Sequence, residues 1–164
     1  MKARKLSFIA ILSVLITMSA FFKLPNPFLG GEFQMSAPIA IIIAYIFGFR
    51  NYFIAGIISS IISFVLGFMT VYGIIVSMVF RVCVGIGVYI FKNRNIGFFI
   101  VGPISTFIAR LALSLIFKLS LYTLLIPTIP GMIFTVIMCR VFFNGFYRAV
   151  ENSVYSDFIV CRRS

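Results

Sequence analysis

The 164-residue sequence has no histidine and only three acidic residues, against 14 lysines and arginines. Of these acids, Glu32 lies far along the chain from Glu151 and Asp157. Protein metal sites are built mainly from His, Cys, Asp and Glu side chains, and acid–base catalysis draws mostly on His and carboxyl groups. The shortage of these residues argues against a metal site, a Ser/His triad or a catalytic carboxylate pair. The sequence therefore predicts a protein with no enzymatic activity and no cofactor.

Cysteine is also scarce, and the three cysteines Cys83, Cys139 and Cys161 show neither pairing nor metal-ligand spacing. Two of them lie inside apolar segments, where a free cysteine behaves as a small hydrophobic side chain. We expect them to pack rather than to react.

Charged residues make up 10% of the chain and hydrophobic residues 62%, with a mean hydropathy of +1.18. Soluble domains carry about 25% charged residues, so this composition excludes an ordinary soluble domain. Apolar runs of about 20 residues recur, and each is long enough to cross roughly 30 Å of hydrocarbon. Runs such as residues 40–47 lack the alternation of a membrane β-strand. The sequence predicts an all-α integral membrane protein with a single transmembrane domain over residues 1–164.

Six transmembrane helices in one compact bundle are predicted, followed by a cytoplasmic tail over residues 147–164. The expected helices cover about residues 6–22, 35–49, 52–69, 71–91, 96–117 and 124–146. The first follows Lys2, Arg4 and Lys5, as a signal peptide would, but no cleavage site and soluble domain follow it. We therefore interpret it as a retained first helix.

The positions of the basic residues predict the orientation in the membrane. With a cytoplasmic N-terminus, nine lysines and arginines of the loops and termini lie inside, and only Lys23 and Lys118 lie outside. Cytoplasmic segments carry such an excess of positive charge. An even number of helices then places both termini in the cytoplasm. The basic residues flank apolar segments and form no aromatic-interleaved basic face, so the net charge of +11 does not indicate a nucleic-acid partner.

Residues 23–38 separate the first two apolar segments and concentrate backbone breakers and polar groups. They contain Pro25, Pro27, two adjacent glycines and Glu32. The orientation above places this stretch outside the cell. A polar loop that interrupts an otherwise apolar chain is a candidate binding element.

Small residues spaced four apart favour close helix–helix contact in membranes. Three such rows occur: Gly56 and Ser60; Gly73, Ser77, Arg81 and Gly85; and Gly102, Thr106, Arg110 and Ser114. An arginine at the centre of a transmembrane helix costs about 2.5–3.5 kcal/mol even on the most lenient scale. Either Arg81 and Arg110 pair with carbonyls and hydroxyls, or they line an outward-facing pocket between the fourth, fifth and sixth helices.

Neither arginine has an acidic partner in its own helix, because no predicted span contains Asp or Glu. Either Glu32 folds inward to pair with one of them, or a bound anion supplies the missing charge. If both occur, the site has a cationic and an anionic end, which suits a zwitterion or a carboxylate-bearing ring. Aromatic residues such as Tyr122 could stack on that ring, although ordinary packing also accounts for them.

The chain resembles, over nearly its whole length, the substrate-binding S components of energy-coupling-factor (ECF) vitamin transporters. The likeness rests on six predicted helices in 164 residues, the Phe-x-x-x-x-Pro pattern from Phe33 to Pro38, Gly48 and Gly56. It implies a high-affinity membrane subunit that binds a vitamin or related nutrient. It also implies docking on a membrane-embedded T subunit and a pair of ABC ATPases in the bacterial plasma membrane.

By the same resemblance, the first external loop forms a lid over residues 24–34, and the later helices line the pocket. The predicted substrate-binding residues are Asn26, Glu32, Gln34, Arg81, Arg110 and Tyr122. Small residues on the first helix, Ala3/Ser7 and Ser13/Thr17, match the spacing of the family's docking face loosely. A tryptophan-type S component fits a site with a cationic and an anionic end.

A second function class is a small structural protein of the cell-envelope machinery, similar to the rod-shape MreD type. Such a scaffold would hold no ligand and would associate with envelope proteins instead of ATPases. The polar first loop favours the binding subunit, because a scaffold needs no polar lid. A proton-coupled transporter acting alone is disfavoured, since no predicted span holds an Asp, Glu or His to relay protons.

Overall fold

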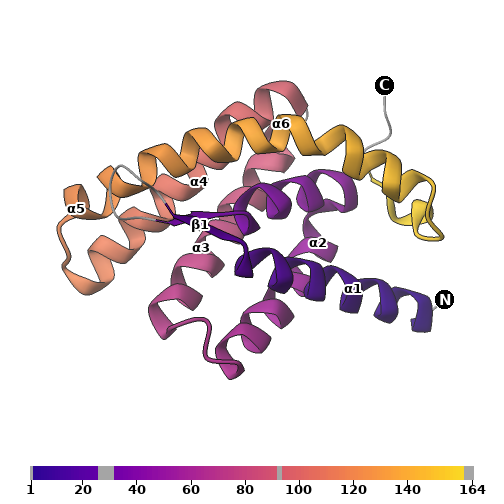
Figure 1. Cartoon of the computed structure of the whole chain (residues 1–164), viewed down its shortest axis with the longest axis horizontal. Coiled ribbons are helices and arrows are strands. Elements are labelled where there is room, and N and C mark those ends of the chain that lie inside the picture. Colours follow the sequence, from indigo (N-terminus) through magenta and orange to yellow (C-terminus); the bar gives the residue numbers. More distant parts are fainter. Residues whose placement is uncertain (1, 26–31, 92–93, 161–164) are drawn as a thin grey trace.

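The structure is a computed structural model that describes residues 2–25, 32–91 and 94–160, with the backbone alone for residues 2, 23–25, 32–34, 94, 95 and 98. Its long helices are α1 (Lys2–Phe21), α2 (Ser36–Val65), α3 (Val71–Ile90), α4 (Arg94–Phe117) and α6 (Ile129–Glu151). A short helix α5 (Leu121–Leu125) and a 3-10 turn η1 (Ile126–Thr128) precede α6, and a second turn η2 (Ser156–Phe158) follows it. Strands β1 (Lys23–Pro25) and β2 (Glu32–Gln34) pair antiparallel between α1 and α2 (Figure 1).

Five helical spans are long and apolar enough to cross a membrane by length and composition, with α5 to α6 counted as one. The described part of the chain therefore has the helices of a multi-pass membrane protein. The prediction of six separate helices is not reproduced, because α2 covers both segments expected at residues 35–49 and 52–69. The last helix also continues to Glu151, beyond the expected end at residue 146.

A sharp bend at Gly48 divides α2 into two halves. Gly48 has φ 78° and ψ 163°, a conformation that only glycine adopts readily. The sequence predicts that the second helix ends at about residue 49 and that the third begins at about residue 52. In the structure, α2 instead continues through this region, and Gly48 is its single non-helical residue.

Contacts with α1 show that the two halves of α2 run in opposite senses. The β-hairpin joins the end of α1 to the start of α2, and Phe47, just before the bend, packs edge-on against Phe8 with ring centroids 4.8 Å apart. The first half therefore runs back along α1. Beyond the bend, Ser59 accepts a hydrogen bond of 2.9 Å from Thr17, farther along α1. The second half thus follows the direction of α1.

The first half of α2 is the centre of the bundle. All residues from 40 to 47 are at most 6% exposed, and α1, α4 and α6 pack around them. Gly102 allows α4 to approach closely, since a Cβ there would lie 3.2 Å from Ile41 Cδ1 and 3.3 Å from Thr135 Cγ2. The longest uninterrupted apolar run is thus screened from lipid by the other helices.

The N- and C-terminal segments lie at the same end of the bundle (Figure 1). Arg4 Nη1 and Asp157 Oδ2 form an ion pair of 3.0 Å. The start of α1 and the segment after α6 therefore lie on one side of the bundle. Assignment of that side to the cytoplasm stays a prediction from the charge distribution.

Substitution of Gly48 by alanine is expected to destabilise the protein. An alanine at position 48 would have to adopt a backbone conformation that costs about 1–3 kcal/mol for a residue with a side chain. Its Cβ would also lie 3.3 Å from Val160 Cγ2. Thermal unfolding in detergent should show a lower midpoint for Gly48→Ala. Gly145→Ala is the matched control, because a Cβ at Gly145 on α6 meets open space. Equal midpoints for the two variants would show that the bend is not a constraint on folding.

Candidate functional site

Arg81 projects from the middle of α3 into the interface with the second half of α2. Its side chain is 5% exposed, and its Nη1 donates a hydrogen bond of 2.5 Å to Ser60 Oγ. Met78 Sδ lies 3.9 Å from the same nitrogen. Gly56 makes room for the guanidinium, because a Cβ at this position would overlap the Arg81 side chain. The two predicted rows of small residues therefore face each other across α2 and α3.

The same interface continues on both sides of Arg81. One turn earlier on α3, Ser77 Oγ lies 3.3 Å from Ser60 Oγ. One turn later, Gly85 faces Phe49, and a Cβ on Gly85 would overlap the phenylalanine ring. Small residues at a spacing of four thus bring the helices close enough to enclose a charged side chain.

Tyr52 is the residue of this cluster that the sequence analysis missed. Its side chain is fully buried, and its hydroxyl lies beside the Arg81 guanidinium. Among the residues that the structure describes, this hydroxyl is a buried polar group with no hydrogen-bond partner of good geometry. Its position one turn before Gly56, on the same face of α2, was the available signal.

The cluster has more hydrogen-bond donors than acceptors. A guanidinium has five N–H donors, and within the described ranges the oxygens beside Arg81 are the hydroxyls of Ser60 and Tyr52. No described carboxylate lies within ion-pair distance of Arg81. Asp157 pairs with Arg4, and Glu151 lies exposed at the end of α6. An anion that accepts from Arg81 and from the Tyr52 hydroxyl would correct this imbalance.

The pocket was predicted between the fourth, fifth and sixth helices, which correspond to α3, α4 and α6 of the structure. This prediction needs one correction, because the Arg81 side chain turns toward α2 instead. Arg110 lies half-buried on α4, without a hydrogen bond or ion pair to any residue that the structure describes. Its row begins at Gly102, which packs against α2 and α6. The two arginines are therefore on different interfaces of the bundle.

Of the other predicted site residues, the structure places the backbone of Glu32 and Gln34 in β2 and Tyr122 on α5, away from the start of α1. Asn26 lies outside the described residues. Glu32 and Gln34 belong to β2, where they pair with Pro25 and Lys23, and only their backbone is described. β2 lies against α6 and α1. Tyr122, on α5, is 75% exposed and is not part of the Arg81 cluster.

Comparison with known proteins identifies a relative. No protein-family model matches the chain, and no solved structure matches it. Over 129 residues, the chain is 40% identical to Protein BioX of Lysinibacillus sphaericus, covering 79% of this chain and 78% of the relative. The chain belongs to the BioX family. This membership supports the resemblance to S components only loosely, and it gives no support to the tryptophan-type variant.

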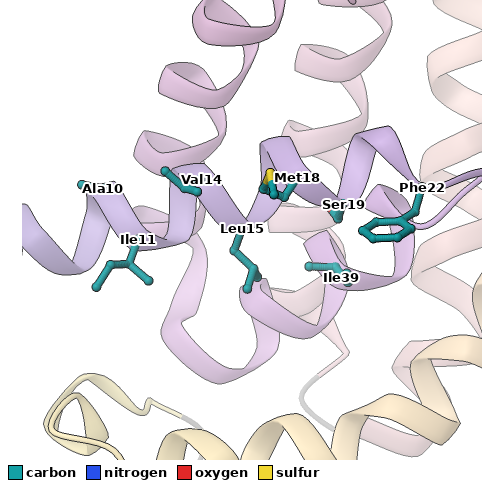
Figure 2. A pocket seen from close by; sticks show the side chains of 8 residues that line it. All are labelled: Ala10, Ile11, Val14, Leu15, Met18, Ser19, Phe22 and Ile39. Atoms are coloured by element: carbon teal, nitrogen blue, oxygen red, sulfur yellow. The ribbon is translucent and has the colours of Figure 1, made fainter.

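The BioX-family chain has an apolar groove on its outer surface, away from the Arg81 cluster. Figure 2 shows that the groove follows one side of α1 and reaches the start of α2. It has a volume of about 530 Å³ and is lined by Ala10, Ile11, Val14, Leu15, Met18, Ser19, Phe22 and Ile39. Its lining is almost entirely apolar, so it does not suit a polar nutrient.

The docking face expected on the first helix also needs correction in this BioX-family chain. Ser13 and Thr17 are buried, and Thr17 donates its hydrogen bond to Ser59 of α2. They pack inside the bundle and cannot meet a partner subunit. Ser7 remains exposed and bonds to the carbonyl of Ala3.

Proposed function

We propose that this BioX-family chain is the membrane-embedded substrate-binding subunit of an ECF-type ABC importer, and that its substrate is a small nutrient with a carboxylate group. The observation that carries the proposal is the buried Arg81 guanidinium, which lies beside the buried Tyr52 hydroxyl and has no described acidic partner. A T subunit and a pair of ABC ATPases would supply the energy for import across the bacterial plasma membrane.

Burial of a charge explains why a ligand is needed. Removing a guanidinium from water costs several kcal/mol, and a single hydroxyl partner offsets this cost poorly. A carboxylate can accept two parallel N–H bonds from an arginine, and such bonds are about twice as strong as neutral ones. The Tyr52 hydroxyl would add a third donor. The arrangement is therefore better satisfied with a bound carboxylate than without one.

Biotin is our candidate substrate. The name of the relative, BioX, suggests this vitamin, whose side chain ends in a carboxylate. In this proposal Arg81 and Tyr52 bind the carboxylate, and Asn26, Glu32 and Gln34 in the hairpin region contact the polar ring system. In this proposal Arg110 and Tyr122, which lie outside the Arg81 cluster, contribute from the periphery of the site. Biotin thereby replaces tryptophan as the expected ligand.

Mass spectrometry of the purified protein tests the proposal. The protein, expressed in biotin-containing medium and purified in mild detergent, is expected to retain a carboxylic acid. Glu32→Ala and Arg110→Ala should each lower ligand retention by about tenfold or more, the loss expected for one charge-assisted hydrogen bond. Arg148→Ala is the matched control, because this arginine lies exposed in the last turn of α6.

Two results would contradict parts of this proposal. Full retention in both variants would remove Glu32 and Arg110 from the site while leaving the Arg81 cluster untouched. Absence of any ligand, together with co-purification of envelope proteins instead of ATPases, would favour the structural scaffold.

A further inference from the structure

The segment after α6 is packed onto the bundle instead of extending away from it. Residues 153–160, which we call the strap, pass through η2 and end at the bend of α2. The Val160 N–H donates a hydrogen bond of 2.7 Å to the carbonyl of Ile46. The Val160 side chain lies against Gly48. Helix ends leave carbonyls without helical donors, and the strap supplies one of the missing donors at this bend.

Aromatic stacking fixes the middle of the strap. The rings of Phe158 and Phe8 are nearly parallel, at 7°, with centroids 4.5 Å apart. Phe8 in turn packs edge-on against Phe47, so the three rings form a column from the strap to the last turn before the bend. Phe8 is 2% exposed, and Tyr155 covers it from a second direction with a centroid distance of 5.4 Å.

Polar contacts attach the strap to the start of α1. Arg4 forms its ion pair with Asp157 and also donates to the carbonyl of Val154. Exposed ion pairs contribute little stability, so the aromatic column and the Val160 hydrogen bond provide most of the attachment. Such a segment, with few buried contacts, opens more readily than the core of the bundle.

We propose that the strap is a conformational device that holds the bend of α2 in a single geometry. When the strap is attached, it fixes the end of the first half of α2 through Ile46, Gly48 and Phe47. When it detaches, the second half of α2 becomes free to shift against α3. Because that half carries Tyr52 and Ser60, release of the strap would loosen the Arg81 cluster. The contacts of the strap itself do not depend on any ligand.

Hydrogen–deuterium exchange of two truncated proteins tests the proposal without a ligand. Truncation after Asn152 removes the strap, whereas truncation after Val160 removes only residues 161–164 and serves as the matched control. Amides of residues 46–56 are expected to exchange about tenfold faster without the strap than in the full chain. The control truncation should match the full chain. Equal exchange at the bend in both truncations would overturn the proposal.

If truncation prevents folding, point variants of the full chain test whether the strap holds the bend of α2. Phe158→Ala removes the stacked ring, and Val160→Pro removes the N–H that bonds to Ile46. Val154→Ala is their control, because the Val154 side chain is 73% exposed and its carbonyl is retained. Faster exchange is expected at residues 46–56 in the first two variants, with residues 105–115 of α4 unchanged. Unchanged exchange at the bend in both variants would overturn the proposal.

Discussion

Replacement of Arg81 by methionine is expected to abolish ligand retention while leaving the protein at least as stable as the wild type. Methionine fills a similar volume and removes a buried charge that costs about 2.5–3.5 kcal/mol at the centre of a membrane helix. Loss of the bonds to a carboxylate should weaken binding by about 30-fold or more, or about 2 kcal/mol. Thermal unfolding and ligand quantification on the same preparations measure the two effects separately.

Arg148→Met controls for the removal of positive charge, since Arg148 is exposed. It should retain the ligand fully. If Arg81→Met instead lowers the unfolding midpoint strongly and keeps its ligand, the guanidinium has a structural role with Ser60 and Tyr52. The carboxylate site would then be wrong.

Replacement of Gly56 by leucine is expected to have the largest effect on stability. A Cβ at Gly56 already overlaps the Arg81 side chain, so a leucine must push the guanidinium out of its buried position or separate α2 from α3. Overpacking of this kind costs about 1–3 kcal/mol, and a displaced guanidinium also loses its hydrogen bond to Ser60 while remaining charged. Thermal unfolding in detergent should show a marked drop in the midpoint. Gly145→Leu, on α6 in open space, should show little change.

A second substitution can test whether the clash is specific. In the double variant Gly56→Leu/Arg81→Ala, the leucine can occupy the space that the arginine side chain leaves. The double variant is therefore expected to be more stable than the sum of the two single effects predicts. Strict additivity would mean that Gly56 and Arg81 do not share this interface.

The close packing of α2 and α3 was predictable from the sequence. Small residues at a spacing of four on both segments, including Ser60 and Ser77, indicate a close contact, and the structure brings these two hydroxyls to 3.3 Å. The shortage of acids likewise predicts an arginine whose own helix contains no acidic partner. Both predictions depend on local spacing and composition, which a single sequence displays directly.

The bend and the strap could not be predicted in the same way. Gly48 marks a break, but glycine is compatible with a loop, a turn or a bent helix, and the choice depends on Val160, which lies more than a hundred residues later. The tail contains Phe158, Ile159 and Val160, an apolar run that was the available signal for packing. Which partners it meets depends on the whole fold.

The candidate site was predicted only in part for a similar reason. Arg81 was identified because a charge inside an apolar helix is conspicuous. Its partner Tyr52 was not, because tyrosine is common in membrane helices and its role depends on which helix lies opposite. The expected pocket between the later helices followed from the two arginines inside apolar segments and from the family resemblance, whereas the side-chain contacts direct Arg81 toward α2.

The most direct test of the Arg81 site is a calorimetric titration of the ligand-depleted, purified protein with biotin and, side by side, with biotin methyl ester. The ester keeps the ring system but lacks the negative charge that Arg81 is proposed to bind. We predict that biotin binds and that the ester binds about 30-fold more weakly or not at all. Equal affinity for the two compounds, or binding of neither, would contradict the account.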